Sequence, residues 1–349
     1  MNSRQRLIGI VLVLALLGAG MSYSFLATPA GTIAVTAEPG RGEAPRIPYD
    51  KIRAFDYLKQ ICALGPRISA TPGMEKQIEL LKKHFEQHGF TVELQKFQAQ
   101  QRSRPTPVEM VNLIARWNPE AKRRILLCTH YDTRPIADEE PDPKDWTKPF
   151  IGANDAGSGA AMMMELAHHM KELAPAIGVD FVLFDGEEYI FSHLSEANGG
   201  DRYFIGSEHF AGQYVGKFRN TPDAPKYLEG ALLDMVAGKN AKFLYEETSA
   251  LRAGVVVEKI WKIAGEVGST CFVPKYGVGV RDDHLALLDA GIPAIDIVPC
   301  TNADTFRRLG EPFLTYPHWH RLTDTPENCS PDTLEQVGRV LSVWIKRAK

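Results

Sequence analysis

The sequence predicts an α/β fold with three layers, α/β/α, in which helices cover both faces of a central, mixed and mostly parallel twisted sheet. Three observations favour this fold class. Strand-like apolar segments alternate with helical patterns along the chain. Residues 179–184 are almost entirely apolar, as expected for a strand buried on both faces. No linker-like stretch interrupts the chain after residue 50, so we expect residues 49–349 to form a single domain.

Hydrophobic periodicity places the individual elements. Met74, Ile78, Leu81 and Phe85 recur at spacings of four, three and four residues, so they share one helix face, and Gly89 ends that helix. We expect helices at residues 49–64, 74–88, 156–173, 249–267, 285–290 and 331–349. We expect strands at residues 91–97, 110–117, 124–129, 179–184, 230–233 and 294–298. No internal repeat is visible in the sequence.

Composition excludes several classes of protein. The 349 residues include 40 Lys and Arg against 43 Asp and Glu, with 44% hydrophobic and 24% charged residues. These values fit a folded globular protein and exclude a disordered chain or one with many membrane spans. A formal net charge of -3 provides no broad positive field, so nucleic acid is not an expected partner.

The N-terminus has the pattern of an export signal. Arg4 and Arg6 precede an apolar run at residues 7–21, and small residues such as Ala27 and Ala30 follow it. This pattern is typical of a secretory signal peptide or a short membrane anchor at residues 1–27. Residues 28–48, rich in Pro, Gly, Ala and Thr, are expected to form a flexible tether. We therefore expect an exported protein that is periplasmic, secreted or anchored in the membrane with its folded domain outside the cytoplasm.

The five cysteines allow only a limited prediction. They cannot all pair within one chain, so at least one thiol is free or pairs elsewhere. Cys300 and Cys329 lie in an irregular region and could form a disulfide in an exported protein. A zinc finger with cysteine ligands is excluded, because no two cysteines have the short spacing that such sites use.

Polar residues of one chemical kind follow the expected strands. Because ligands of α/β sheets collect at the carboxyl ends of the strands, we expect these residues to lie close together. Histidine and carboxylate ligands with one open position are typical of a catalytic zinc site. The sequence therefore predicts a zinc site that is formed by His130 and Asp132, Asp155, Glu187 and Glu188, Asp234, and His320.

Glu187 and Glu188 have a further property. In extended backbone successive side chains point to opposite sides, so one glutamate can bind a metal while its neighbour faces the substrate as a base. Each residue also has a plainer interpretation. The two glutamates could be solvated, Asp155 could cap the following helix, and His320 could be a partly exposed loop residue.

Asp282 and Asp283 precede the short helix expected at residues 285–290. Either residue could cap this helix, or a buried carboxylate there could lie next to Glu187 and raise its pKa or share its proton. Two other activities are excluded. Ser158 lacks the nucleophile elbow of serine hydrolases, and Gly277 and Gly279 form only half of a dinucleotide-binding pattern.

At these motifs the sequence resembles the zinc-dependent exopeptidase superfamily, and within it the animal-type glutaminyl-peptide cyclotransferases, or glutaminyl cyclases. The resemblance runs from Gly65-Pro66-Arg67 to the C-terminal helix. It is carried by residues 130–135, 152–157, 184–188, 232–235, 282–284 and 319–320. It implies the zinc exopeptidase-like fold for residues 49–349, as one catalytic domain.

The resemblance also implies roles for individual residues. A single zinc ion would be held by Asp155, Glu188 and His320. Glu187 would be the general acid and base, Asp234 and Asp282 would belong to its proton-handling network, and Trp319 would line the substrate pocket. In the related two-metal aminopeptidases the positions of His130 and Asp234 hold a second zinc, which Asp155 bridges. One zinc is expected. Whether His130, Asp132 and Asp234 bind a second metal ion or support the first zinc site stays open.

The activity implied is cyclisation of the N-terminal glutamine of peptides or proteins to pyroglutamate with release of ammonia, by a monomer. One alternative is a two-metal aminopeptidase that hydrolyses N-terminal residues. The other is a metal-free binding protein, for which loss of Glu187 or His320 would be the signature. The sequence departs from the animal pattern in three places. His193 stands where a second pocket tryptophan is found, Asp296 stands where a histidine is found, and residues 300–314 are an added segment.

Overall fold

A computed structural model of the chain describes residues 47–192, 198–218, 221 and 224–349. The expected signal or anchor at residues 1–27, most of the expected tether, and His193 lie outside these residues. Among the helices that the structure describes, none is long and apolar enough to cross a membrane.

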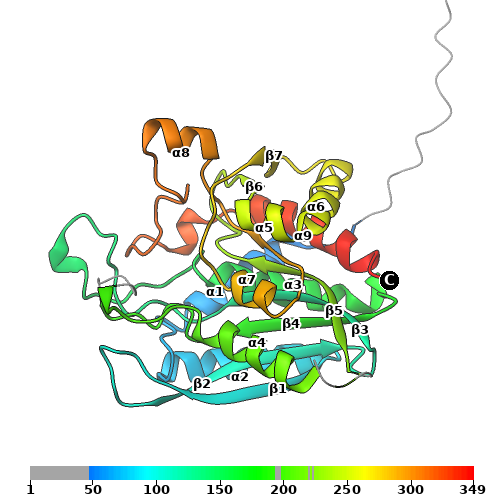
Figure 1. Cartoon of the computed structure of the whole chain (residues 1–349), viewed down its shortest axis with the longest axis horizontal. Coiled ribbons are helices and arrows are strands. Elements are labelled where there is room, and N and C mark those ends of the chain that lie inside the picture. The colour runs from blue at the N-terminus through cyan, green and yellow to red at the C-terminus, as the bar shows by residue number, and fades with distance from the viewer. Residues whose placement is uncertain (1–46, 193–197, 219–220, 222–223) are drawn as a thin grey trace, which may run out of the picture. The chain divides into compact units, whose positions relative to one another are not determined.

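The main sheet has six strands in the order β1-β2-β4-β3-β5-β8. Figure 1 labels the first five of them, β1 to β5. Strands β4, β3, β5 and β8 pair in parallel, whereas β2 runs antiparallel to both of its neighbours, as expected for a mixed and mostly parallel sheet. The strands are β1 (Thr91–Ala99), β2 (Val108–Trp117), β3 (Arg123–His130), β4 (Gly178–Phe184), β5 (Lys226–Leu233) and β8 (Ala294–Ile297). A second, two-stranded sheet pairs β6 (Phe243–Tyr245) with β7 (Phe272–Tyr276).

Helices cover both faces of the main sheet, which confirms the three-layer prediction. The larger hydrophobic core, on one face, contains side chains of α1 (Lys51–Cys62), α2 (Pro72–Gln87), α3 (Gly157–Leu173), α6 (Gly254–Glu266) and α9 (Pro331–Lys346). The smaller core, on the other face, contains side chains of α4 (Ile205–Phe218) and α7 (His284–Asp289). The remaining helices are α5 (Glu247–Arg252) and α8 (Ala303–Leu309), with short 3-10 turns at Pro143–Asp145 and Pro326–Asn328.

The central strand β3 shows how the two cores are separated. Ile125 and Leu127 point into the larger core, and Leu126 and Cys128 point into the smaller one, because successive side chains of a strand face opposite sides. Both faces are apolar, so the sequence of β3 is a continuous hydrophobic run rather than an alternation.

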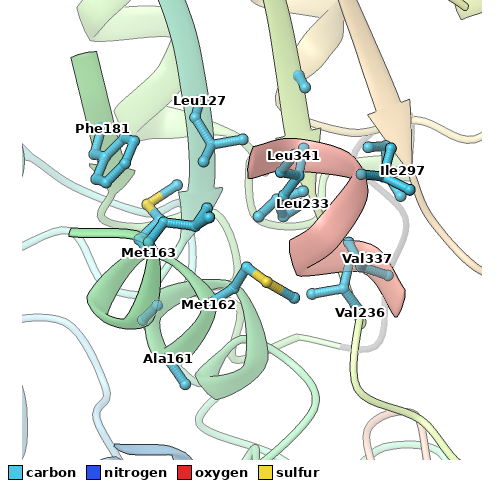
Figure 2. Close-up of a cluster of buried hydrophobic side chains, with 14 of the residues drawn as sticks. Leu127, Ala161, Met162, Met163, Phe181, Leu233, Val236, Ile297, Val337 and Leu341 are labelled. Atoms are coloured by element: carbon cyan, nitrogen blue, oxygen red, sulfur yellow. The ribbon is translucent and has the colours of Figure 1, made fainter. Parts of the chain in front are cut away.

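The larger core is packed between α3, α9 and the strands (Figure 2). Met163 of α3 lies close to Leu127 of β3, Met162 lies beside Met163 on α3, and Leu341 of α9 lies beside Leu233 of β5. All five side chains are fully buried. Burying a side chain of this size stabilises the fold by roughly 1.5–3 kcal/mol, so this contact holds the start of α3 firmly against the sheet.

One helix prediction was wrong in part, and one long helix was missed. The single helix expected at residues 249–267 is divided into α5 and α6 at Ala253, whose φ of -134° and ψ of 33° are not helical. The helix α4 was not expected, because Gly206, Gly212 and Gly216 each lower the helical propensity of its sequence. The strands β6 and β7 and the helix α8 were also not expected.

The cysteines do not form the disulfide that the sequence allowed. All five are buried free thiols. Cys300 lies in a small apolar cluster with Leu244 and Val278, whereas Cys329 lies in the larger core with Cys62. Burial raises the pKa of the Cys300 thiol to about 12, so this group stays protonated and packs as an apolar side chain.

A buried ion pair joins β3 to β4. The Arg124 Nε donates to both carboxylate oxygens of Asp180, each at 3.0 Å. The Arg124 Nη1 donates to the carbonyl oxygens of Asn118 and Ala121, at 2.8 and 2.9 Å. The Tyr227 hydroxyl donates to Asp180 Oδ2 at 2.5 Å. Almost every polar atom of this pair therefore has a partner, which is the condition under which a buried ion pair is tolerated.

We expect Asp180→Asn to lower the free energy of unfolding by about 3–5 kcal/mol, because it leaves the Arg124 charge buried without an anion. Urea unfolding followed by circular dichroism measures this loss. As a control, Glu93→Gln breaks the more exposed Arg116–Glu93 pair and should cost less than about 1 kcal/mol. Equal unfolding midpoints for the two variants would contradict the importance of the buried pair.

Candidate active site

The predicted site residues meet at one edge of the sheet. His130 is the last residue of β3, and Asp234 directly follows β5. Glu187 and Glu188 follow β4 after a turn at Gly186, whose φ of +74° suits glycine. Because β4, β3 and β5 are adjacent and parallel, their carboxyl ends bring these side chains together.

Asp132 fixes the backbone of the two glutamates. Its Oδ1 accepts a hydrogen bond from the Glu187 backbone N–H at 3.2 Å, and its Oδ2 accepts one from the Glu188 N–H at 3.0 Å. The Asp132 side chain is fully buried. Both of its oxygens are engaged by the backbone, so the structure places Asp132 as a support for the glutamates and not at the pocket surface.

Asp155, Glu188 and His320 form the first group that could hold a metal ion. One ligand atom of each lies within 4.8 Å of the others. The His320 Nε2 is 2.5 Å from Glu188 Oε1 and 3.8 Å from Asp155 Oδ2. Asp155 Oδ2 and Glu188 Oε2 are buried without a hydrogen-bond partner. Unpaired buried carboxylate oxygens are costly unless a cation neutralises them, so this donor set fits a divalent ion.

The second nitrogen of His320 also has an anionic partner. His320 Nδ1 is 3.2 Å from Asp138 Oδ1, and Arg134 Nη2 donates to Asp138 Oδ2 at 2.6 Å. Burial opposes the charged form of His320, but Glu188 and Asp138 outweigh it and raise the pKa of His320 to about 9. Burial also opposes the charged form of Asp138, yet His320 and Arg134 hold its pKa below its usual range. The carboxylate of Asp138 therefore fixes the orientation of the His320 ring.

His130, Asp155 and Asp234 form a second group with metal-ligand geometry. The His130 Nε2 is 3.1 Å from Asp155 Oδ1 and 3.4 Å from Asp234 Oδ1. Burial disfavours the charged form of His130, but the nearby carboxylates of Asp132, Asp155 and Asp234 raise its pKa well above the usual value. Asp155 belongs to both groups and could face either one ion or two.

Glu187 lies beside the first metal group and has a strongly perturbed acidity. Burial raises the pKa of Glu187 well above its usual value, and the charges of Glu188 and Asp282 raise it further, whereas His130 opposes the shift. Burial and the charge of Asp234 likewise raise the pKa of Asp282. The sequence hypothesis of a carboxylate that raises the pKa of Glu187 therefore agrees with the structure.

The plainer interpretations of these residues were wrong. Glu187, Glu188 and His320 are only 8%, 3% and 3% exposed, so they are neither solvated glutamates nor a surface histidine. The residue at the N-cap position of α3 is Ala156 and not Asp155. Asp283 does occupy the N-cap position of α7, but its side chain makes no capping hydrogen bond.

The site opens into a cavity of about 420 Å³. Glu187, Asp234 and Asp282 lie on its polar side, and Trp319, Phe313 and Leu314 are among its apolar lining. The Trp319 ring packs on the His320 ring with centroids 3.9 Å apart, and Phe313 packs edge-on against Trp319 at 5.3 Å. A cavity of this size suits a small group such as the end of a peptide.

The added segment at residues 300–314 contributes part of this wall. An isolated β-bridge joins Cys300 to Leu314, so the two ends of the segment lie side by side. The Thr301 N–H donates to the Phe313 carbonyl oxygen at 2.8 Å, which holds Phe313 at the base of the excursion. Between these ends the segment forms α8, where Leu309 is exposed.

The sequence did not single out Asp138, Asp324 or Tyr203. Asp324 accepts hydrogen bonds from the backbone N–H groups of Asn154 and Asp155 at 2.9 and 3.1 Å, and from the Tyr316 hydroxyl at 2.7 Å. Tyr203 lines the cavity. No local pattern marks the roles of Asp138 and Asp324, because His320 and Asp155, on which they act, are distant from them in sequence.

Asp296, which departs from the animal pattern, is buried on β8 on the same side of the sheet as α7. Its Oδ2 is 3.7 Å from His284 Nδ1, and burial and the charge of Asp282 raise its pKa well above the usual value. Asp296 therefore belongs to the carboxylate network behind Asp282 and is not among the residues that line the cavity.

Comparisons with known proteins show the family of this chain. The family model of peptidase family M28 matches residues 112–345. The glutaminyl-peptide cyclotransferase of Bos taurus is 25% identical over 264 residues, which cover 67% of this chain and 65% of the bovine protein. The chain thus spans slightly less than two thirds of the length of this curated relative.

Solved structures extend the likeness. The glutaminyl cyclase of Fimbriiglobus ruber is 45% identical, with a TM-score of 0.79 over 90% of this chain and 100% of that one. A leucine aminopeptidase precursor from Bacteroides thetaiotaomicron VPI-5482 is 31% identical, with a TM-score of 0.76 over 87% of this chain and 99% of that one. The chain therefore belongs to peptidase family M28, in the zinc exopeptidase-like superfamily, and groups within it with the glutaminyl cyclases.

Proposed function

We propose that this protein converts the N-terminal glutamine of peptides and proteins to pyroglutamate and releases ammonia. The observation that carries the proposal is the position of Glu187. It is a buried acid of raised pKa that lies beside, and not within, the group formed by Asp155, Glu188 and His320. The likeness to the Fimbriiglobus ruber glutaminyl cyclase over its whole length supports the same activity.

Asp155, Glu188 and His320 would hold one zinc ion. One imidazole and two carboxylates, with a position open to the cavity, are the ligands of a catalytic zinc site. When bound, the ion would supply Lewis-acid polarisation of the glutamine side-chain amide. Asp138 would keep the His320 ring in place, and Asp324 would keep the Asp155 backbone in place.

Glu187 would carry the proton. The substrate's α-amine attacks the carbon of its own side-chain amide, which closes a five-membered lactam and breaks the bond to the amide nitrogen. Glu187 takes a proton from the amine and delivers it to that nitrogen, which leaves as ammonia. Its raised pKa makes it a stronger base than an ordinary glutamate. Asp282 contributes to this shift, and Asp234 in turn raises the pKa of Asp282.

The cavity wall would keep water out. Since the nucleophile belongs to the substrate, water in the site is a competitor that would give glutamate instead of pyroglutamate. Trp319 and Phe313 form an apolar wall next to His320. A closed pocket there would hold the glutamine side chain folded against its own amine, which favours ring closure.

A two-metal aminopeptidase is the second candidate, and one observation favours it. His130 and Asp234 form a second group that shares Asp155 with the first, as a two-ion site requires. The Bacteroides thetaiotaomicron structure described as a leucine aminopeptidase precursor has a similar fold. In that case water would replace the substrate amine as the nucleophile. Both Glu187 and His320 are present, so the signature expected for a metal-free binding protein is missing.

Three further features belong to the proposal. Residues 49–349 would act as one catalytic domain, as a monomer that takes peptide or protein N-termini as its partners. Residues 1–27 would direct export, either as a cleaved signal or as a membrane anchor, with residues 28–48 as the tether. The reaction would then take place outside the cytoplasm.

Peptide substrates separate the two candidate activities. We expect the chain to release ammonia from a peptide that begins with Gln, with about one zinc per chain. Mass spectrometry of the products and elemental analysis of the protein measure both quantities. Release of free leucine from a peptide that begins with Leu, together with two zinc ions per chain, would instead establish the aminopeptidase.

We expect Glu187→Gln to keep the zinc and to lower kcat by about 10²–10⁴-fold, because the amide cannot transfer the proton. Glu208→Gln is the control, since Glu208 lies on the surface of α4 in an exposed pair with Arg202. Turnover of the Glu187 variant within a few fold of the unmodified chain would show that another group is the base.

We expect Asp138→Asn to weaken zinc binding by about 10–100-fold, because the His320 ring loses the anion that orients it. Competition with a chromogenic chelator measures the affinity. Asp145→Asn, which changes a more exposed pair with Lys148, should leave the affinity unchanged. Identical zinc affinities for both variants would mean that Asp138 does not position the ligand.

A further inference from the structure

Three histidines gather between α2 and α3, away from the cavity. His84 lies in the last turn of α2, His88 directly follows that helix, and His168 lies on α3. One ring nitrogen of each lies within 4.8 Å of the others. His168 is about three helical turns beyond Gly157, where α3 begins next to the candidate active site. None of the three lines the cavity.

Backbone carbonyl groups fix two of the rings. The His84 Nε2 is 2.8 Å from the Met164 carbonyl oxygen, and the His88 Nδ1 is 2.8 Å from the His84 carbonyl oxygen. A carbonyl oxygen only accepts, so each of these nitrogens carries the proton. The lone pairs of the neutral rings are therefore on His84 Nδ1 and His88 Nε2. A ring whose N–H donates to a carbonyl is typical of metal-ligating histidines.

The His168 ring can also act as a metal ligand in the orientation that it has in the structure. The His168 Nδ1 is 3.1 Å from the His88 Nε2, and its Nε2 is 2.5 Å from the Tyr57 hydroxyl. This hydroxyl can donate or accept, so the proton of a neutral His168 can be on either nitrogen. With the proton on Nε2, the lone pairs of His88 and His168 face each other. Their separation is close to the ~3.3 Å between two nitrogens that bind one tetrahedral zinc ion.

The charged side chains next to the three rings are paired with each other. The Arg53 Nε lies 2.6 Å from the Glu165 Oε2, so the positive charge of Arg53 is balanced by a carboxylate.

We propose that His84, His88 and His168 form a second kind of metal site, the tri-histidine site, which binds Zn²⁺ or a similar late first-row divalent cation. Imidazole nitrogens suit these ions. The rings of His84 and His88 are each oriented by a hydrogen bond to a backbone carbonyl oxygen. A bound ion would link the end of α2 to α3. The site does not depend on the proposed cyclisation, since its residues are outside the cavity.

Zinc stoichiometry tests the tri-histidine site. The full chain is stripped with a chelator and dialysed against buffered Zn²⁺, and the zinc per chain is measured by elemental analysis. His88→Gln and His168→Gln should each bind one zinc fewer than the unmodified chain, with pyroglutamate formation unchanged. The control His209→Gln, on α4 where the ring stacks on Phe97 at 4.2 Å, should bind the full amount. Equal zinc content in all four proteins would overturn the proposal.

Nuclear magnetic resonance of the unmodified chain gives a second readout if His168→Gln does not fold. Addition of Zn²⁺ should shift the ¹⁵N resonances of the three lone-pair nitrogens in His84, His88 and His168. Shifts confined to His130 and His320 would place all of the zinc at the candidate active site and overturn the proposal, whatever activity the chain has.

Discussion

Buried negative charge at the carboxyl edge of the sheet is the constraint on which the rest of the site depends. Asp155, Glu188 and Asp234 each have a buried oxygen without a hydrogen-bond partner. Such groups are stable only if they bind a proton or a cation. Both kinds of stabilisation, by a bound proton and by a neighbouring positive charge, are found among the carboxylates of this site. Glu187, among like charges, has a raised pKa, whereas Asp138, between His320 and Arg134, has a lowered one.

In two loops of the site, one buried carboxylate accepts hydrogen bonds from two successive backbone N–H groups. Asp132 accepts hydrogen bonds from the successive N–H groups of Glu187 and Glu188, and Asp324 does the same for Asn154 and Asp155. Each buried carboxylate thus holds a loop whose side chains face the cavity. The loops follow or precede elements that are packed into the larger core, so side chains from distant parts of the chain are placed without long flexible connections.

Much of the fold and of the site could be predicted because the signals are local. The face of α2 is visible in the spacing of Met74 and Leu81, and the polar residues after β3, β4 and β5 mark one edge of a parallel sheet. Asp138 and Asp324 could not be predicted, because each acts through a partner that only the tertiary structure brings near. The helix α4 was missed for a local reason, since its glycines weaken a pattern that packing against β2 and α7 restores.

The origin of Phe313 and Leu314 has a consequence for how enzymes of this fold diversify. The two residues belong to an excursion whose ends are paired at Cys300 and Leu314, outside the main sheet that carries Glu187. Changes in that excursion can reshape the rim without disturbing the proton-transfer machinery. Selectivity for the second and later residues of a peptide can therefore evolve through this loop, while the residues at the sheet edge that carry out the chemistry stay unchanged.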